Sequence, residues 1–354
     1  MQFNNYDNKN RSDFISTQTI KRGALMPNDK SFVEFIHKNK HVESRDVNEC
    51  MKAVVHFQDY LKTKGIWYAS KITARDAADY LISIREHDAN ISRTIGILTD
   101  YAFFIENNDL FSEFVLLRDA WNVMNRSSEI TKEMDPIAWE KVFGDNDPPE
   151  VGATLDEMAD YSREFQKKML EAMTRERFEA IMVKNAHSWE PDWDWDEKSV
   201  LDEAGTIDKY LAECHQKMIE ELEGCRDRGE LYFTQEIDDE VVDFVKKNLK
   251  IERIGNILRQ KRIPYMVKNY LNAVDPVTRR YYACHCPWKR NSILQGKPLS
   301  KSMCYCCMGH AKKSLDLAFE KEIQGKVVKS MMEADCDLCT YEYEIPYDVL
   351  RKYW

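Results

Sequence analysis

The stretch MGHAKKSLDLAFEKEIQGKVVKSMM, residues 308–332, decides the fold class because its apolar spacing changes from helical to alternating. Its first part, residues 308–323, predicts a helix whose inward face carries Leu315, Ala318, Phe319 and Ile323. Its second part, residues 325–332, predicts a strand, as do residues 340–345 and residues 279–283. A helix inserted between strands of a small antiparallel sheet predicts an α+β module.

Upstream of this module, residues 30–125 contain apolar residues at helical spacing in several short segments. Thr73 followed by Asp76 predicts a capping box, and Ser92 is the expected cap of the next helix. We therefore expect a compact bundle of four or five helices.

The chain divides into four predicted parts. Residues 1–29 are polar and are expected to form a flexible N-terminus, and residues 30–125 form the helical bundle. Residues 126–154 contain Asp135-Pro136 and DNDPPE and are expected to be a linker. Residues 155–354 are the cysteine-rich α+β module, which begins with helices at about 155–185, 207–225 and 238–249. The Trp-rich segment SWEPDWDWDEKS, residues 188–199, is expected to be a surface loop.

The composition limits the classes of function. The 354 residues are 43% hydrophobic and carry a net charge of -10, so binding to nucleic acid is not expected, because that binding depends on basic residues. No apolar run reaches the roughly 18–20 residues of a membrane span, and the start has no apolar signal-peptide core. The expected location is the cytoplasm, and the expected partners are a small-molecule ligand and a protein partner or second copy at the bundle.

Seven of the ten cysteines fall between Cys284 and Cys339, which in a cytoplasmic protein indicates metal binding or thiol chemistry. The two C-x-C pairs should each place both sulfurs on one face of a strand, and the C-x-x-C has the spacing of a zinc pair or a redox dithiol. The predicted metal ligands are Cys284, Cys286, Cys304, Cys306, Cys336 and Cys339, with zinc or an iron–sulfur cluster as cofactor. Cys307 is expected only to pack in the core.

Two other interpretations remain open beside the metal site. In one, Cys306 or Cys286 is a nucleophile and His310 or His285 is its base, with His310 near the start of a helix that lowers the pKa of the thiol. In the other, the cysteines line a pocket for a small apolar or thiol-reactive ligand.

A basic pair follows the first cysteine segment. Arg290, with its neighbour Trp288, is a candidate for binding a ligand or cofactor through an anionic group, whereas the commoner role of Lys289 and Arg290 in such a sequence is to be solvated. Cysteines that pack as small hydrophobic residues are the alternative for the cluster as a whole.

The C-terminal half is similar to a known group of bacterial proteins. The order CHCPW, CYCCMGH, an amphipathic helix, a strand and CTYEYEIP resembles the L-2-amino-thiazoline-4-carboxylic acid hydrolase-like and vinyl-4-reductase-like domains, over residues 155–350 and most sharply over 281–345. This resemblance implies an α+β small-molecule-binding domain whose characteristic cysteines correspond to Cys284, Cys286, Cys304, Cys306 and Cys339.

The N-terminal bundle resembles the helical core-binding domain of tyrosine recombinases in FQDYLKTKG, ITARDAADYL and SRTIGILTDYAFFIENN. That resemblance implies the shape of the bundle. It does not imply DNA binding, since this stretch has no excess of basic residues. The predicted function is therefore binding of a small molecule or metal at the cysteines, with hydrolysis of a C–N or C–S bond as a compatible activity. The alternative is a non-enzymatic ligand or metal sensor whose bundle engages a protein partner or DNA.

Overall fold

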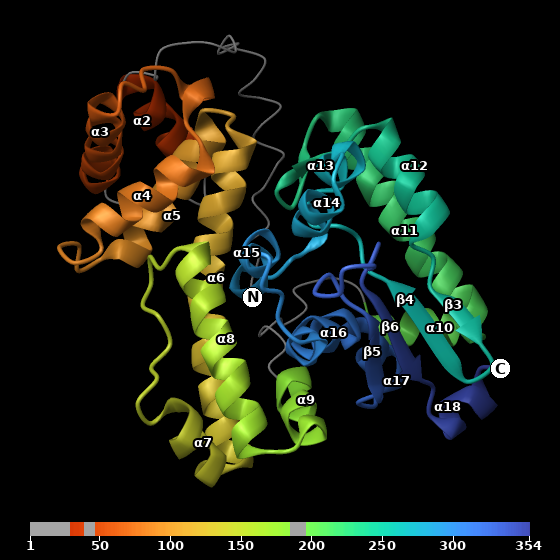
Figure 1. The fold of residues 1–354 in the computed structure, drawn as a ribbon. Coiled ribbons are helices and arrows are strands. Elements are labelled where there is room, and N and C mark those ends of the chain that lie inside the picture. Colours follow the sequence, from red (N-terminus) through yellow and green to blue (C-terminus); the bar gives the residue numbers. More distant parts are fainter. Residues whose placement is uncertain (1–28, 39–46, 185–195) are drawn as a thin grey trace.

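A computed structural model describes residues 29–38, 47–184 and 196–354 of the chain (Figure 1). Helices from the first half form a tall column on one side of the molecule, and the strands lie on the other side with more helices around them (Figure 1). The α+β class is confirmed. The predicted flexible N-terminus lies outside the described residues except for its last position.

The N-terminal helices form the predicted bundle around an aromatic core. They are α2 (Asp29–Lys38), α3 (Val47–Thr63), α4 (Ala74–Ile84), α5 (Ile91–Phe104) and α6 (Asn108–Met134), with the short 3-10 turn η1 (Ala69–Lys71) after α3. The ring of Phe57 contacts those of Tyr80 and Phe114, at centroid distances of 4.9 and 6.0 Å, and so joins α3 to α4 and α6. Large buried rings of this kind supply much of the apolar area that stabilises a helical bundle.

Capping residues set the starts of these helices. The predicted capping box is present at α4, where the backbone N–H of Thr73 donates to Asp76 Oδ2 at 2.8 Å and that of Asp76 donates to Thr73 Oγ1 at 3.3 Å. Ser92 was wrongly predicted as a cap, because α5 already begins at Ile91. Asp88 organises that start instead, since its carboxylate accepts hydrogen bonds from the backbone of Asn90 and the hydroxyl of Thr94.

The predicted linker, residues 126–154, is largely helical. Its first part belongs to α6, and α7 (Pro136–Phe143) follows after one residue. Asp135 caps α7 by accepting from the backbone N–H of Ala138 at 3.0 Å, with Pro136 in the first helical position. The Asp-Pro dipeptide therefore starts a helix rather than a loop, because proline fits the first turn, where its missing N–H has no intrahelical role.

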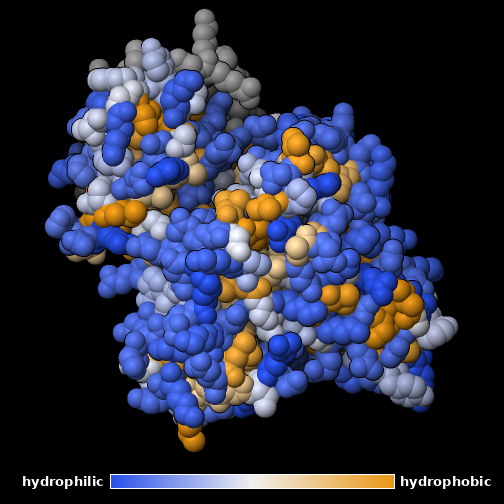
Figure 2. All heavy atoms as spheres, in the orientation of Figure 1, coloured by the Kyte–Doolittle hydropathy of each residue, from blue (hydrophilic) through white to orange (hydrophobic). Residues whose placement is uncertain are grey.

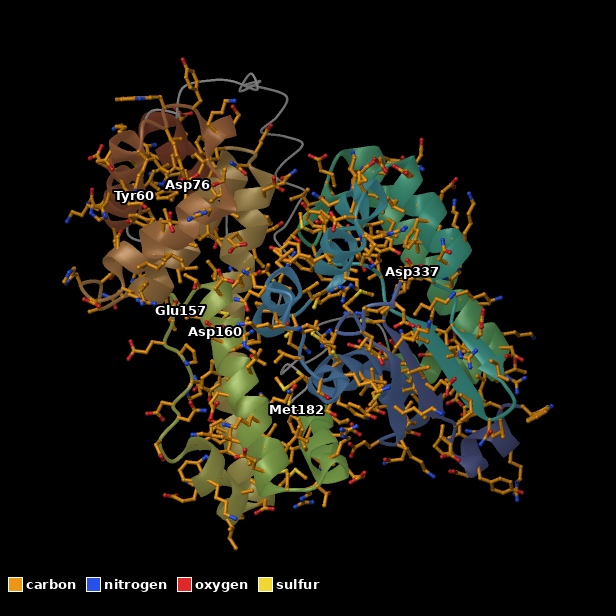
Figure 3. The ribbon with its side chains drawn as sticks, in the orientation of Figure 1. Tyr60, Asp76, Glu157, Asp160, Met182 and Asp337 are labelled. Atoms are coloured by element: carbon orange, nitrogen blue, oxygen red, sulfur yellow. The ribbon has the colours of Figure 1, made fainter. Side chains whose placement is uncertain are left out.

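Helices continue through the next part of the chain. They are α8 (Leu155–Ala172), α9 (Arg175–Lys184), α10 (Glu197–Ala204), α11 (Ile207–Arg228) and α12 (Asp239–Asn248), so the helix predicted at 155–185 is divided in two. Most of the Trp-rich segment lies outside the described residues, and its last residues form the start of α10. Glu157 at the start of α8 pairs with Arg85 after α4 at 2.8 Å, which links α8 to the N-terminal bundle (Figure 3).

Two antiparallel sheets provide the β component. β1 (Leu231–Tyr232) pairs with β2 (Gln235–Glu236), and a larger sheet has the order β3-β4-β6-β5, built from β3 (Glu252–Ile254), β4 (Ile257–Lys261), β5 (Gly325–Lys329) and β6 (Thr340–Glu344). The strands predicted at 325–332 and 340–345 correspond to β5 and β6. The hairpin of β3 and β4 was not predicted.

The strand predicted at residues 279–283 was wrong, because these residues end the helix α14 (Pro276–Ala283). Asp275 accepts hydrogen bonds from the backbone N–H groups of Val277 and Thr278 and so caps this helix, with Pro276 in its first position. The cap overrides the alternating pattern of the last residues.

The remaining helices surround the cysteine segments. They are α13 (Val267–Asn272), α15 (Pro287–Leu294), the 3-10 turn η2 (Lys301–Cys304), α16 (Tyr305–Ala311), α17 (Lys313–Phe319) and α18 (Tyr347–Lys352). The helix predicted at 308–323 is thus shared between α16 and α17, and its four predicted inward residues are all buried. α15 packs against α8 and α6, and α16 packs against α9 and β5, so both lie between the helical column and the sheet (Figure 1).

One glycine allows the close approach of α16 to α9. A Cβ atom at Gly309 would lie 2.1 Å from the backbone oxygen of Val183 in α9, which is far inside van der Waals contact. The outer surface is mostly hydrophilic, with apolar residues in several separate patches, some of them near the centre of this view (Figure 2). Within the described ranges, no helix combines the length and apolar character needed to cross a bilayer.

A buried lysine within the cysteine cluster

Three separate segments carry the seven clustered cysteines. One is the extended connection from α14 to α15, the second comprises η2 and the first turn of α16, and the third is the turn before β6. None of the ten cysteines, all of which lie in the described ranges, is part of a disulfide. Five of the seven clustered cysteines are buried, and Cys307 and Cys339 are half-buried.

The sulfur atoms of the three segments lie near one another, with Cys304 as the common member. The Cys304 thiol interacts electrostatically with those of Cys284, Cys336 and Cys339 on the other two segments. Its Sγ also lies 3.0 Å from the Ser330 hydroxyl. The three cysteine segments predicted to form one group therefore do lie near one another. The expectation that both cysteines of a C-x-C pair lie on one face of a strand holds for only one of the two pairs.

The pair Cys284 and Cys286 has extended backbone at both positions, as expected for side chains on one face. The other C-x-C pair does not lie on a strand, because Cys304 ends η2 and Cys306 is in α16. That part of the prediction was wrong, since positions two apart on a helix point in different directions.

The third segment is held in place from outside the cluster. The hydroxyl of Tyr270 in α13 donates to Asp337 Oδ1 at 2.7 Å, and Arg279 lies over the Tyr270 ring with its guanidinium carbon 4.6 Å from the centroid. Figure 3 shows Asp337 beside these helices, above the larger sheet. The contact fixes the turn that carries Cys336 and Cys339.

The most unusual residue of the site is Lys289, which was expected to be solvated but is only 1% exposed. Its Nζ donates to the backbone oxygen of Met303 at 2.8 Å and lies 3.7 Å from Sγ of Cys307. No carboxylate of the described residues forms an ion pair with it. Transfer of an isolated ammonium group into a protein interior is strongly unfavourable, so a counter-charge is required if Lys289 is protonated.

Sulfur atoms are the groups that can supply this counter-charge. Burial by itself disfavours the charged form of Lys289, but the surrounding thiols outweigh burial and raise its pKa well above the usual value; they are Cys286, Cys304, Cys307 and Cys306. The attraction is mutual, because the ammonium lowers the pKa of nearby thiols and thereby opposes the effect of their burial.

Burial dominates for most of the cysteines. It raises the pKa of Cys284 to about 11 and that of Cys306 to about 12. The predicted lowering of the pKa at Cys306 is therefore wrong in direction, because the thiol is fully enclosed. Cys286 also has a raised pKa, first because of its hydrogen bond with Cys307 and then because of burial.

The two histidines occupy positions that differ from the predicted base. His310 lies in the last turn of α16 and not at the start of a helix, so the expected helix-terminus effect on a neighbouring thiol does not apply to it. Nε2 of His285 donates to the backbone oxygen of Ile263 at 2.6 Å, and its ring packs edge-on against Tyr265. That Nε2 already has a partner and is not available to take a proton from a thiol.

Trp288 and Arg290, the predicted cofactor-binding residues, are both buried in the packing of α15. Trp288 packs against the ring of Tyr161 in α8 at 5.8 Å. The guanidinium of Arg290 lies 4.1 Å from the ring centroid of Tyr281 and 5.2 Å from that of Tyr265, and it interacts electrostatically with the buried Glu113 of α6. Both side chains thus take part in the contact between the module and the helical column.

Cys307 and Lys289 are the residues that sequence reasoning missed. Cys307 was expected only to pack, yet it is half-buried, is hydrogen-bonded to Cys286 and is close to the lysine ammonium. The available signal was the spacing of Cys286 and Lys289, three residues apart at the start of a helix, which places both on one side.

The cysteines were also predicted as ligands of zinc or an iron–sulfur cluster. In the described part of the chain, no three side chains of His, Cys, Asp or Glu are arranged so that they could hold a metal ion. The thiols instead share the ammonium of Lys289, and a second positive charge at that position would be repelled. Zinc or an iron–sulfur cluster at these cysteines therefore stays a prediction.

Comparisons of this chain with protein-family models, with curated proteins and with solved structures find no match. The two family resemblances therefore stay predictions.

Proposed function

We propose that the cysteine cluster is a site of thiol chemistry, in which a Cys307 thiolate paired with the Lys289 ammonium reacts with a small electrophilic molecule. The observation that carries this proposal is a fully buried lysine whose neighbours are sulfur atoms and a backbone carbonyl. A protonated lysine in such a place is stabilised when one of those sulfurs is negatively charged.

Cys307 is the thiol best suited to react. Its Sγ lies 3.7 Å from Lys289 Nζ, and Cys307 is half-buried and so more open to a reagent than Cys286, Cys304 and Cys306, which are buried. The thiolate is the nucleophilic form of cysteine, and a nearby cation increases the fraction present at neutral pH.

Hydrolysis of a C–N or C–S bond fits this arrangement. Attack of the Cys307 thiolate on an electron-poor carbon forms an S–C bond and releases an amine or thiol, which takes a proton from Lys289. Water then cleaves the S–C bond, and the thiol returns its proton to Lys289. The lysine is the acid in the first step, in place of either predicted histidine.

The competing proposal is a sensor that binds the same ligand without turning it over. It is favoured by the position of α15, which carries Lys289 and packs against α6, a helix that belongs to the N-terminal bundle. Occupation of the site could then be passed to the bundle and to a partner there. Multiple turnovers favour the enzyme, whereas binding that saturates without product favours the sensor.

The test is alkylation of the native, reduced protein with iodoacetamide at neutral pH, mapped by mass spectrometry. Cys307 should react before the other six clustered cysteines, and Lys289→Met should slow its alkylation by about tenfold. Lys313→Met, which removes a half-buried lysine charge from the adjoining helix, should leave the rate unchanged. An unreactive Cys307 in the folded protein, or equal rates in all three proteins, would overturn the proposal.

A further inference from the structure

We infer that Cys286 and Cys307 form a redox-active dithiol that closes to a disulfide when the protein meets a hydroperoxide. The inference rests on the proposed function, because it requires the Cys307 thiolate, and it names an oxidant class for that same site.

The two thiols have the relationship that such a pair requires. They belong to different segments, one at the N-terminal end of α15 and one in the first turn of α16. Both lie beside the same lysine, because Lys289 Nζ is 3.7 Å from Cys307 Sγ and Cys286 is three residues before Lys289 at the start of α15, and the two thiols interact with each other. The half-buried Cys307 can meet a peroxide, and the buried Cys286 is protected from it. Cys307 is therefore placed to attack the peroxide, and Cys286 is placed to attack the oxidised sulfur of Cys307.

The backbone around Cys286 can adjust to form the bond. This residue lies just before α15, with φ -94° and ψ 114°, so its side chain is carried by an extended connection rather than by the interior of a helix. Small changes of backbone angle there can bring its sulfur to bonding distance without unwinding a helix.

Other cysteines are less suited to be the partner. Cys306 is adjacent to Cys307 in the chain, and the roughly 3.8 Å between neighbouring Cα atoms is shorter than the roughly 4.4–6.8 Å usual in disulfides. Cys304 is in contact with the Ser330 hydroxyl, 3.0 Å away, and lies at the end of η2. Cys286 is the thiol that is hydrogen-bonded to Cys307 from another segment.

The reaction balances with a hydroperoxide, ROOH, as the oxidant. The Cys307 thiolate attacks the outer oxygen, the O–O bond breaks, and Cys307 becomes a sulfenic acid while the released alkoxide takes a proton from Lys289 to give ROH. The Cys286 thiol then attacks the Cys307 sulfur and releases water as the S–S bond forms. Two thiols and ROOH thus give a disulfide, ROH and water.

The buried lysine gives this reaction a physical consequence. Closing the disulfide removes the thiolate, and the transferred proton leaves Lys289 neutral. Both members of the buried charge pair are therefore discharged together, so no unpaired charge remains in the interior.

The experiment is to treat the reduced full-length protein with stoichiometric hydrogen peroxide and to measure its mass and its disulfide-linked peptides. The expected product has lost about 2 Da, the mass of two hydrogen atoms, and contains a peptide that joins Cys286 to Cys307. Cys286→Ser should instead stop at a sulfenic acid on Cys307, which dimedone traps. Cys339→Ser is the control and should still form the bond.

The possible outcomes separate this inference from the proposed function. Alkylation of Cys307 by iodoacetamide without formation of the disulfide would overturn the inference alone. A protein in which neither reagent reacts at Cys307 would overturn both. A bond between other cysteines, or oxidation of Cys307 directly to sulfinic acid, would also overturn the inference.

Discussion

Lys289 Nζ and Cys307 Sγ lie 3.7 Å apart, although one residue is on α15 and the other is on α16. Each helix is held by a different part of the molecule, α15 by α8 and α6, and α16 by α9 and the sheet. The ammonium and the sulfur therefore meet because each helix is positioned separately by these contacts. Changes in that packing should alter the thiol chemistry.

The lysine itself should contribute little to stability. Lys289→Met should change the free energy of unfolding by no more than about 1–2 kcal/mol, because the lost hydrogen bond to Met303 is offset by removal of a buried charge. Lys289→Ala should destabilise the protein by more, about 2–4 kcal/mol, since it also leaves a cavity. Urea unfolding measures both, and a greater loss in the Met variant would contradict the expected offset.

The stability of the protein should depend on the protonation of Glu113. This carboxyl group is 8% exposed, and burial raises its pKa from 4.5 to about 7, against the opposing effect of Arg290. The folded state thus holds a proton that the unfolded state releases above its own pKa, so this contribution is fully present below pH 4.5 and is lost as pH rises through about 7. The loss over that interval should be about 3 kcal/mol.

Glu113→Gln isolates this effect, since glutamine keeps the shape and cannot ionise. Urea unfolding at a series of pH values should show that the variant gains stability relative to the native protein as pH rises from about 5 to about 8. A constant difference between the two proteins across that range would show that the carboxyl group does not titrate as described.

The approach of α16 to α9 should tolerate no side chain at Gly309. Gly309→Ala should lower the free energy of unfolding by about 1–3 kcal/mol or more, because the new Cβ would lie 2.1 Å from the backbone oxygen of Val183. It should also change the rate of Cys307 alkylation, since α16 carries that cysteine. Figure 3 marks Met182 on α9, the residue before this contact.

Gly224→Ala is the matched control, because Gly224 also lies within a helix. Its Cβ would meet the end of the Arg228 side chain at 2.8 Å, and a flexible side chain can move. This change should stabilise the protein by about 0.5–1 kcal/mol through helix propensity. Equal effects of the two substitutions would refute the close contact as the cause.

The metal content gives a further check. If the cysteines act as nucleophiles beside Lys289, elemental analysis and an ultraviolet–visible spectrum of protein purified without oxygen should show zinc and iron well below one equivalent, because the Lys289 ammonium opposes a second positive charge among the same sulfur atoms. Stoichiometric zinc, or the absorption of an iron–sulfur cluster, would contradict this and would favour the metal site predicted from the cysteine spacing.

Local patterns explain the parts of the fold that the sequence predicts well. The capping box at Thr73, the helix period of residues 308–323 and the alternation of residues 340–345 involve neighbours within a few positions along the chain. The error at residues 279–283 arose because two local signals disagreed. The alternating pattern predicted a strand, whereas the cap at Asp275 and Pro276 starts a helix, and the helix forms. Recognition of that cap would have corrected it.

The amino-acid sequence by itself determined the α+β class, the bundle and the gathering of cysteines in three segments, because these follow from composition, period and spacing. Only the tertiary structure decided that Lys289 is buried, that Cys307 Sγ lies 3.7 Å from the Lys289 ammonium nitrogen, and that the thiols of Cys286 and Cys307 interact with each other. The segment PWKR has the composition of a surface turn, and its burial depends on helices that lie more than a hundred residues away along the chain, such as α8. Burial of a charge is a property of what surrounds it, and those surroundings are assembled by packing rather than by neighbouring residues.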